Sequence, residues 1–173
     1  RFKYMAPEVF SYKEFEYIQN HLFILSGFYG AVRPFDGVIP YRLEMQAKLQ
    51  GENFKNLYDF WRGDIAKYIT DGRDTVINLA SDEYFKAVKK YFPENIRVVT
   101  CVFADLENGK LKEKGVKCKM ARGEIVRYMA ENSVQSPEEL KKFQRQGYAY
   151  RDDLSSDDRF VFVQKKICEN HRF

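Results

Sequence analysis

The fold class follows from residues 75–115, which have the sequence TVINLASDEYFKAVKKYFPENIRVVTCVFADLENGKLKEKG. Residues 75–79 form a short segment that is rich in β-branched side chains and almost wholly apolar, which predicts a buried strand. Ser81 can cap a helix that runs to about Phe92, and the negative charges of Asp82 and Glu83 complement the positive end of the helix dipole. A strand that leads directly into a helix indicates an α/β protein.

The second half of this stretch predicts an antiparallel hairpin. Residues 97–106 and 110–115 flank Glu107-Asn108-Gly109, and an Asn-Gly pair favours the tight turn between antiparallel strands. Similar patterns predict helices from Ser11 to about residue 26, over 54–69, over 117–131 and over 136–146, and a final strand over 160–163. We therefore expect one compact α/β domain over residues 1–173, α+β-like, with several helices around a small mixed, partly antiparallel sheet.

Composition excludes several classes of protein. The chain of 173 residues is 45% hydrophobic and 16% aromatic, too apolar for a disordered protein, and it contains no apolar run long enough to cross a bilayer. Its three cysteines are an odd number without a C-x-x-C pair, and it has two histidines. We expect no metal centre, no cofactor, no disulfide framework and no membrane partner, and a cytoplasmic location.

The net charge of +4 is unevenly distributed. Between Lys110 and Arg127, seven basic residues stand against two acidic ones, which leaves the rest of the chain at −1. Such a cluster favours phosphate backbones, but a solvated hairpin and helix face explains it equally well. The candidate phosphate contacts on the helix predicted over 117–131 are Lys119, Arg122 and Arg127.

Residues 25–45, LSGFYGAVRPFDGVIPYRLEM, carry more polar chemistry than packing requires. Gly27 and Gly30 permit a sharp turn whose amide groups can bind an anion, and Arg33 and Arg42 can hold a phosphate or carboxylate. The alternative is that the glycines end a helix and the arginines bond loop carbonyls. Tyr41 and Glu44 complete the polar residues of this segment.

Residues 78–86, at the carboxyl end of the predicted strand, form the second polar segment. Ligands of open α/β sheets bind where strands end and helices begin. The candidate pocket residues here are Asn78, Ser81, Glu83 and Lys86. Ordinary helix capping explains Ser81 equally well, and the acidic side chains oppose an anion at this helix end.

Four separated blocks of the chain closely resemble signature blocks of the YaaA family of bacterial peroxide-stress proteins. The blocks are LSGFYGAVRPFD (25–36), PYRLEM (40–45), VINLASDEYF (76–85) and KMARG (119–123). The resemblance runs in order from about Phe2 to Val163. Members of the family carry a further N-terminal region with a Ser-Pro-Ala-Lys motif that has no counterpart here, so we expect the chain to be an N-terminally truncated domain.

The resemblance implies a cytoplasmic protein that protects against hydrogen peroxide by limiting intracellular free iron. It also implies DNA binding through a positively charged cleft and a helix-hairpin-helix-like element, for which Ser26–Arg33 is the candidate hairpin. DNA recognition through these residues would be independent of base sequence and strongly salt-dependent.

Two functions therefore remain open at the level of sequence. The first is DNA binding in the oxidative-stress response. The second is an enzyme or a nucleotide-type ligand-binding protein with a pocket formed by the Arg33–Glu44 and Asn78–Lys86 segments, although no catalytic motif is recognisable. Direct iron binding fits the sequence poorly, because it would depend on carboxylates alone.

Overall fold

The computed structural model describes residues 5–165, which divide into two compact units. Unit 1 comprises the chain up to Phe15 and from Val99 onward, and unit 2 comprises Glu16–Val98. The predicted α/β class, with helices and a mixed sheet, is confirmed. The expectation of one domain over the whole chain stays a prediction. Among residues 5–165, no helix has the length and apolar character that crossing a membrane requires.

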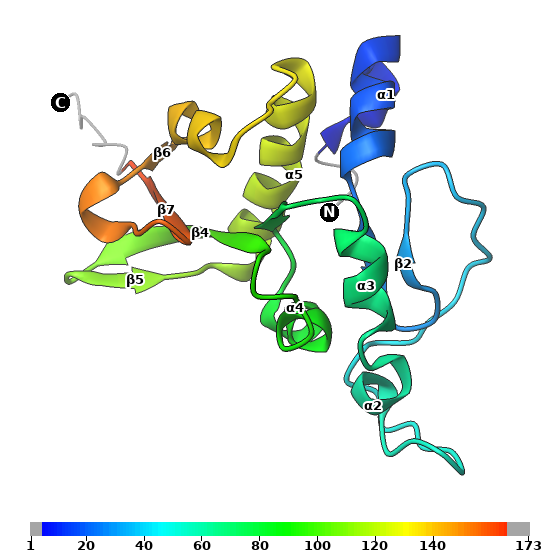
Figure 1. Ribbon diagram of the computed structural model, residues 1–173. Helices are drawn as coiled ribbons and strands as arrows, with labels where there is room; N and C mark the ends of the chain where they lie inside the picture. The colour runs from blue at the N-terminus through cyan, green and yellow to red at the C-terminus, as the bar shows by residue number, and fades with distance from the viewer. Residues whose placement is uncertain (1–4, 166–173) are drawn as a thin grey trace, which may run out of the picture. The chain divides into compact units, whose positions relative to one another are not determined.

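Unit 2 contains a short β-hairpin, a strand and several short helices (Figure 1). Its elements are α1 (Tyr12–His21, which begins in unit 1), β1 (Ile24–Ser26), β2 (Gly30–Val32), α2 (Leu57–Trp61), α3 (Asp64–Thr70), β3 (Thr75–Asn78) and α4 (Asp82–Lys89). Met45, Leu57, Ile65, Ala66 and Val88 form its fully buried core. Burial of these apolar side chains holds the otherwise irregular segment before α2 against the helices.

Three helices of unit 2 are shorter than predicted, and the smallest difference is in α4, which ends at Lys89 and not near Phe92. Ser11 caps α1 as expected, since its Oγ accepts the Glu14 amide at 3.4 Å, but α1 ends at His21 because residues 24–26 pair with residues 30–32 as strands. The helix predicted over 54–69 is split into α2 and α3, because Arg62 has a left-handed φ of 44° that interrupts helical hydrogen bonding.

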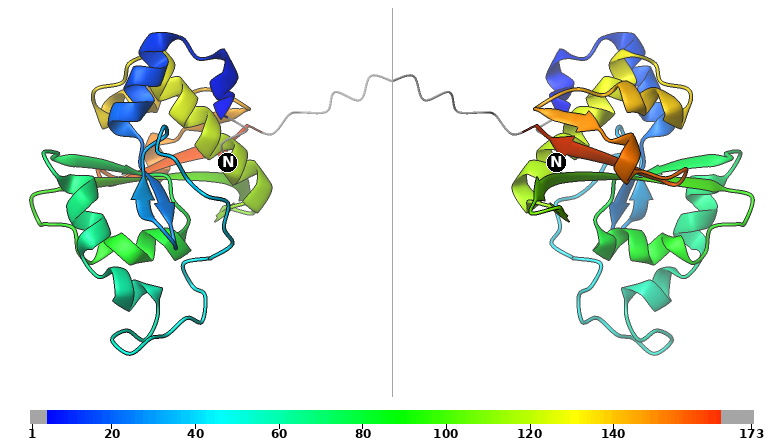
Figure 2. Two further views of the ribbon diagram at one scale, coloured as in Figure 1. Left: turned by 90° about the vertical axis from the view of Figure 1, so that its right-hand side faces the viewer. Right: turned by 90° about the vertical axis from the view of Figure 1, so that its left-hand side faces the viewer.

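Unit 1 is built on β4 (Arg97–Glu107), which enters it from unit 2. The other elements are β5 (Lys110–Lys112), α5 (Gly115–Glu131), β6 (Tyr148–Tyr150), β7 (Arg159–Gln164) and 3-10 helices at Pro7–Val9, Pro137–Lys142 and Asp152–Leu154. β4 pairs antiparallel with β5 and parallel with β7, and β7 pairs antiparallel with β6. Figure 2 shows β7 lying alongside β4.

Aromatic side chains form the core of unit 1. Phe103 stacks on Phe162 at 5.1 Å, and Phe143 meets both rings edge-on. The predicted hairpin, the final strand and α5 are confirmed, whereas β6 was not predicted. The capping box at Ser136 is present, but the helix that follows it is a single 3-10 segment.

Candidate functional site

The turn between β1 and β2 is organised by the buried side chain of Ser26. Its Oγ accepts the amide N–H groups of Phe28 at 3.1 Å and Tyr29 at 2.8 Å, and it forms a third hydrogen bond of 2.5 Å with the hydroxyl of Tyr41. The two amides that lie between Gly27 and Gly30 therefore already bind the serine oxygen. Tyr41 in turn ties residues 40–45 to the hairpin.

Both glycines of the turn are sites of close packing. A Cβ at Gly27 would lie 2.8 Å from the carbonyl oxygen of Leu43, and a Cβ at Gly30, where φ is +75°, would lie 2.9 Å from the Trp61 ring. The Trp61 indole also donates a hydrogen bond of 3.0 Å to the Gly27 carbonyl. Glycine is required at Gly27 by this close approach, and at Gly30 by the close approach together with the positive φ.

The helix-hairpin-helix expectation for Ser26–Arg33 is wrong. This segment joins two antiparallel strands, and within the described unit 2 no helix follows it until α2 begins at Leu57. The physical reason is the register of β1 with β2, in which Leu25 faces Ala31 and Ser26 faces Gly30. Strand pairing uses the backbone groups that a helix would need for itself.

Aromatic rings are exposed beside this hairpin. Phe28 lies 4.8 Å from Tyr29 and 5.3 Å from Tyr41 between ring centroids, and 56% of Phe28 is accessible to solvent. The Tyr29 hydroxyl accepts the amide of Ile39 at 2.9 Å. The Tyr29 contact therefore helps to hold the 33–40 loop against the hairpin.

The second polar segment meets the first one at the start of α4. The Glu83 carboxylate accepts the amide of Gln46 at 3.4 Å, and the Tyr58 hydroxyl donates to the Glu83 carbonyl at 3.1 Å. Burial, and then the charge of Glu83, raise the pKa of Tyr58. Glu83 therefore contacts the chain two residues after Glu44, and the pocket itself stays a prediction.

Tyr84 of α4 is a further residue of this region, and the candidate site residues did not include it. Burial raises the pKa of Tyr84, and the neighbouring Glu83, Tyr41 and Glu44 raise it further, while a backbone hydrogen bond with Met45 acts in the opposite direction. The Tyr84 side chain is partly buried and packs against the core of unit 2. A tyrosine in such a position can bury its ring and still present its hydroxyl to a site.

The other predicted pocket residues differ in their side-chain contacts. Asn78 is buried, and its Oδ1 accepts the Ala80 amide at 3.0 Å. Ser81 occupies the N-cap position of α4, but its side chain makes no capping hydrogen bond. The Lys86 ammonium lies 5.4 Å from the centroid of the Tyr58 ring.

The predicted phosphate contacts are divided between the two units. In unit 2, Arg33 packs on the Phe23 ring, and Arg42 is exposed and forms no ion pair with a described residue. The hairpin residues Gly27 and Gly30 are buried, so their amides are not surface groups. No single surface of described residues within one unit gathers the whole predicted set.

In unit 1, much of the basic cluster is neutralised by ion pairs. Arg122 is only 14% exposed and pairs with Glu113 at 3.4 Å, while its Nε is buried without a hydrogen-bond partner. Arg127 pairs with Glu131 at 2.7 Å. Lys119 is exposed on α5 and has no ion pair among the described residues. The lysines of the β4–β5 hairpin also contact carboxylates, namely Lys112 with Glu107, and Lys114 with Asp105 and Glu107.

Potential metal ligands and thiols add no centre within residues 5–165. No group of three His, Cys, Asp or Glu side chains in that range could hold a metal ion. Cys101 and Cys118 are buried, and the Cys118 thiol donates to the Phe103 carbonyl at 3.0 Å. Cys168 and His171 lie outside the described residues.

Comparison with known proteins gives a consistent family. A family model described as the peroxide stress protein YaaA matches residues 1–154. A UPF0246 protein of Desulfitobacterium hafniense is 53% identical over 164 residues, which cover 95% of this chain and 65% of that protein. A UPF0246 protein of Agathobacter rectalis is 51% identical, with 95% and 66% covered, and one of Pediococcus pentosaceus is 48% identical, with 96% and 66% covered. This chain spans a little under two thirds of the length of these relatives, and it belongs to the YaaA family of peroxide stress proteins.

Proposed function

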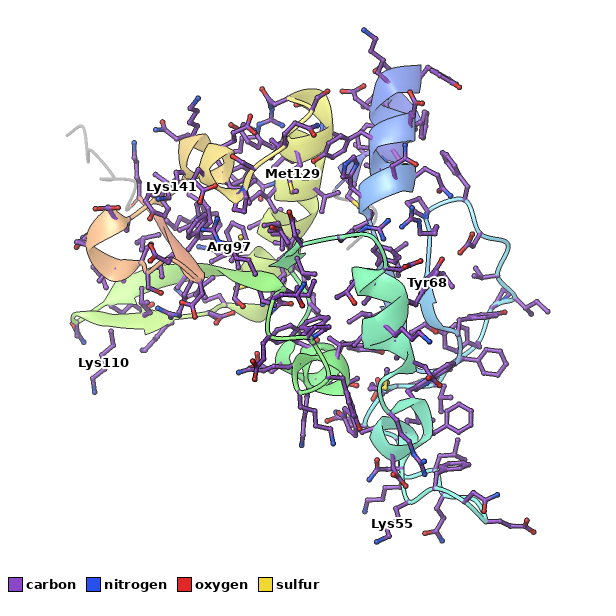
Figure 3. The ribbon with its side chains drawn as sticks, in the orientation of Figure 1. Lys55, Tyr68, Arg97, Lys110, Met129 and Lys141 are labelled. Atoms are coloured by element: carbon purple, nitrogen blue, oxygen red, sulfur yellow. The ribbon has the colours of Figure 1, made fainter. Side chains whose placement is uncertain are left out.

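We propose that this chain is part of a cytoplasmic protein of the hydrogen peroxide response, and that the protein binds DNA through phosphate contacts. The observation that carries the proposal is a set of exposed basic side chains without ion pairs among the described residues. Among the predicted contacts and the basic residues of 110–127, these are Arg42 in unit 2 and Lys110 and Lys119 in unit 1. Lys110 extends from the tip of the β4–β5 hairpin (Figure 3).

Ion-paired lysines are compatible with this function. An exposed salt bridge contributes only about 0–1 kcal/mol, so a phosphate can replace the carboxylate at small cost. Lys112, Lys114 and Lys117 are 45–60% exposed while paired. Contacts of this kind recognise the backbone and not the bases, so the proposed binding is independent of sequence.

A salt-dependent binding measurement tests the proposal. The full-length protein is titrated into labelled duplex, mismatched and junction DNA at about 50 and 200 mM salt, and anisotropy is recorded. We expect Arg42→Ala and Lys119→Ala each to weaken binding of all three DNAs and to reduce the salt slope by about one. Arg151→Ala, which removes a basic side chain that lies outside residues 110–127 and pairs with Asp153, serves as the control and has a smaller effect. Absence of binding to all three DNAs at the lower salt overturns the proposal.

The proposed cellular consequence is less damage from peroxide and free iron. A strain that lacks the gene is complemented with the wild-type protein or with the Arg42→Ala, Lys119→Ala double variant. We expect the double variant, expressed at equal level, to give lower survival in hydrogen peroxide. Equal survival and equal free iron in both strains would contradict a role for these contacts.

A second candidate function is small-molecule binding at Tyr84. It is favoured by the contact of the Glu83 carboxylate with the Gln46 amide, and by the charges of Glu83 and Glu44, which raise the pKa of Tyr84. Two carboxylates fit a ligand with hydrogen-bond donors or positive charge better than the nucleotide suggested by the sequence. A thermal-shift screen of polyamines, sugars and nucleotides tests it. The expected result is stabilisation that is lost in Glu83→Gln, and a flat response to all three classes excludes the site.

A further inference from the structure

Two arginines of unit 2 converge on one aromatic ring and one carbonyl group. The guanidinium carbon of Arg33 lies 4.3 Å from the centroid of the Phe23 ring, and that of Arg73 lies 4.9 Å from the same centroid. Nη2 of Arg33 donates to the Asn20 carbonyl at 3.2 Å, and Nη2 of Arg73 donates to the same oxygen at 3.5 Å. The distance between the two Nη2 atoms therefore cannot exceed the sum of these two hydrogen-bond lengths.

This pair of like charges has no carboxylate partner. Neither guanidinium forms an ion pair with any residue of the described chain. The acidic residues nearest in sequence, Asp36, Asp71 and Asp74, offer no side-chain contact to either group, since the Asp36 carboxylate accepts the Arg33 backbone amide instead. The Asn20 carbonyl, in the last turn of α1, is at the negative end of that helix and offsets the repulsion only in part.

Both arginines are held in place by contacts that leave donors unused. The loop of Arg33 is anchored to α1 by the Phe35 amide, which donates to Gln19 at 3.0 Å. Arg73 follows α3, and its Nη1 donates to the Asp71 carbonyl at 2.6 Å. Tyr68, labelled on α3 in Figure 3, sets its ring edge-on to Phe23 at 5.4 Å. Each guanidinium has five N–H donors, of which the contacts above use one or two.

We propose that Arg33 and Arg73 form a binding site for a phosphate group, centred beside Phe23 and the Asn20 carbonyl. Hydrogen bonds of about 2.9 Å to two oxygens of one phosphate bridge the separation between the guanidinium groups. The anion neutralises two positive charges that the fold places together, and the planar forks of arginine suit this geometry better than ammonium groups. Stacking on Phe23 keeps both forks in position before the anion arrives.

The phosphate group can come from the DNA backbone or from a free phosphate compound. The first source rests on the proposed function, and the second does not. In the first case, Arg73 joins Arg33 as a phosphate contact that sequence reasoning did not identify, because 40 residues separate them along the chain.

Phosphate binding is measured on the full-length protein by titration with inorganic phosphate, monitored by NMR of the arginine Nε–H signals. We expect saturable shifts in the signals of Arg33 and Arg73. Arg73→Gln and, separately, Arg33→Gln should raise the phosphate dissociation constant at least about fivefold, and Arg73→Lys should give an intermediate value. Lys67→Gln is the matched control, because it removes one exposed charge from α3 and should leave the constant within about twofold.

Circular dichroism and thermal unfolding establish whether each variant is folded. If Arg73→Gln does not fold, Arg33→Gln tests the same site. The inference is overturned if the wild-type arginine signals do not shift, or if folded Arg73→Gln and Arg33→Gln bind phosphate as the wild-type protein does.

The same variants are then compared in duplex DNA binding. A lower duplex affinity with a salt slope reduced by about one for Arg73→Gln assigns the site to backbone phosphate. If duplex DNA does not bind the wild-type protein while the phosphate result holds, the proposed DNA function fails and the phosphate site stands, with a free phosphate compound as its ligand. If Arg73→Gln binds duplex DNA as tightly as the wild-type protein but no longer binds phosphate, the site is supported and its ligand is a free phosphate compound.

Discussion

Replacement of Gly30 by alanine tests why the hairpin needs glycine at this position. The close approach of the Trp61 ring should contribute in addition to the backbone conformation. Gly30 has a φ of +75°, and its added Cβ would lie 2.9 Å from the Trp61 ring. Gly72 has a similar φ of +66°, but nothing lies within 4 Å of its added Cβ. The two glycines thus share the conformational requirement and differ in the close approach.

The expected magnitudes follow from these two terms. A left-handed alanine costs about 1–2 kcal/mol, which is the whole expected effect of Gly72→Ala. Overpacking against the partly buried Trp61 ring adds about 1–3 kcal/mol, so Gly30→Ala should destabilise the protein by about 2–5 kcal/mol. If Trp61 is first replaced by leucine, the ring is absent and Gly30→Ala should cost only about 1–2 kcal/mol.

Urea unfolding followed by circular dichroism measures all four variants, since Trp61 is the only tryptophan and cannot serve as the probe throughout. The free energy of unfolding is extrapolated to water for each variant, and the slopes are compared to confirm a common unfolded state. A Gly30→Ala protein no less stable than Gly72→Ala would refute the reasoning, as would a Gly30→Ala cost that is unchanged in the Trp61→Leu background.

Three further predictions concern unit 1. Hydrogen bonds from Lys112 and Lys114 lower the pKa of Glu107 from 4.5 to about 2. The stabilisation of the hairpin by Glu107 is therefore complete above about pH 4.5 and is lost as the pH falls toward 2. A carboxyl NMR titration of Glu107 with a midpoint near 4.5 would contradict this prediction. Burial raises the pKa of the Cys101 thiol to about 12, so its peptide should stay unlabelled by iodoacetamide in the native protein at about pH 8 and become labelled in concentrated urea, as read by mass spectrometry. Phe143→Ala should cost about 3–5 kcal/mol in urea unfolding, because its fully buried ring contacts the other rings of the core; a loss below about 1 kcal/mol would show that the core collapses around the gap.

Local sequence signals predicted the elements whose hydrogen bonds close within a few residues. The Asn108-Gly109 turn formed the hairpin of β4 and β5, with both residues at positive φ. The Ser136 capping box formed with Glu139, although the helix after it stayed short. Such features depend on neighbouring backbone groups and side chains, so they are visible without knowledge of the fold.

Periodicity failed where a distant contact decided the backbone. The apolar stripe over 54–69 is regular in sequence, yet the helix is interrupted at Arg62. This residue follows Trp61, whose side chain packs on the hairpin glycines. In the same way, Leu25 continues a helical pattern but belongs to a strand, because its partner Ala31 is available for pairing. Tertiary contacts outweigh local propensities that amount to less than about 1 kcal/mol per residue.

The sequence by itself determined the α/β class, the family, the N-cap at Ser11 and the segments in which polar side chains gather. Only the tertiary structure decided which of those side chains meet. Arg33 and Arg73 come together around Phe23, and the Glu83 carboxylate meets the amide of Gln46. The physical reason is that these groups are far apart along the chain and are brought together by the burial of apolar surface, which acts without regard to sequence separation.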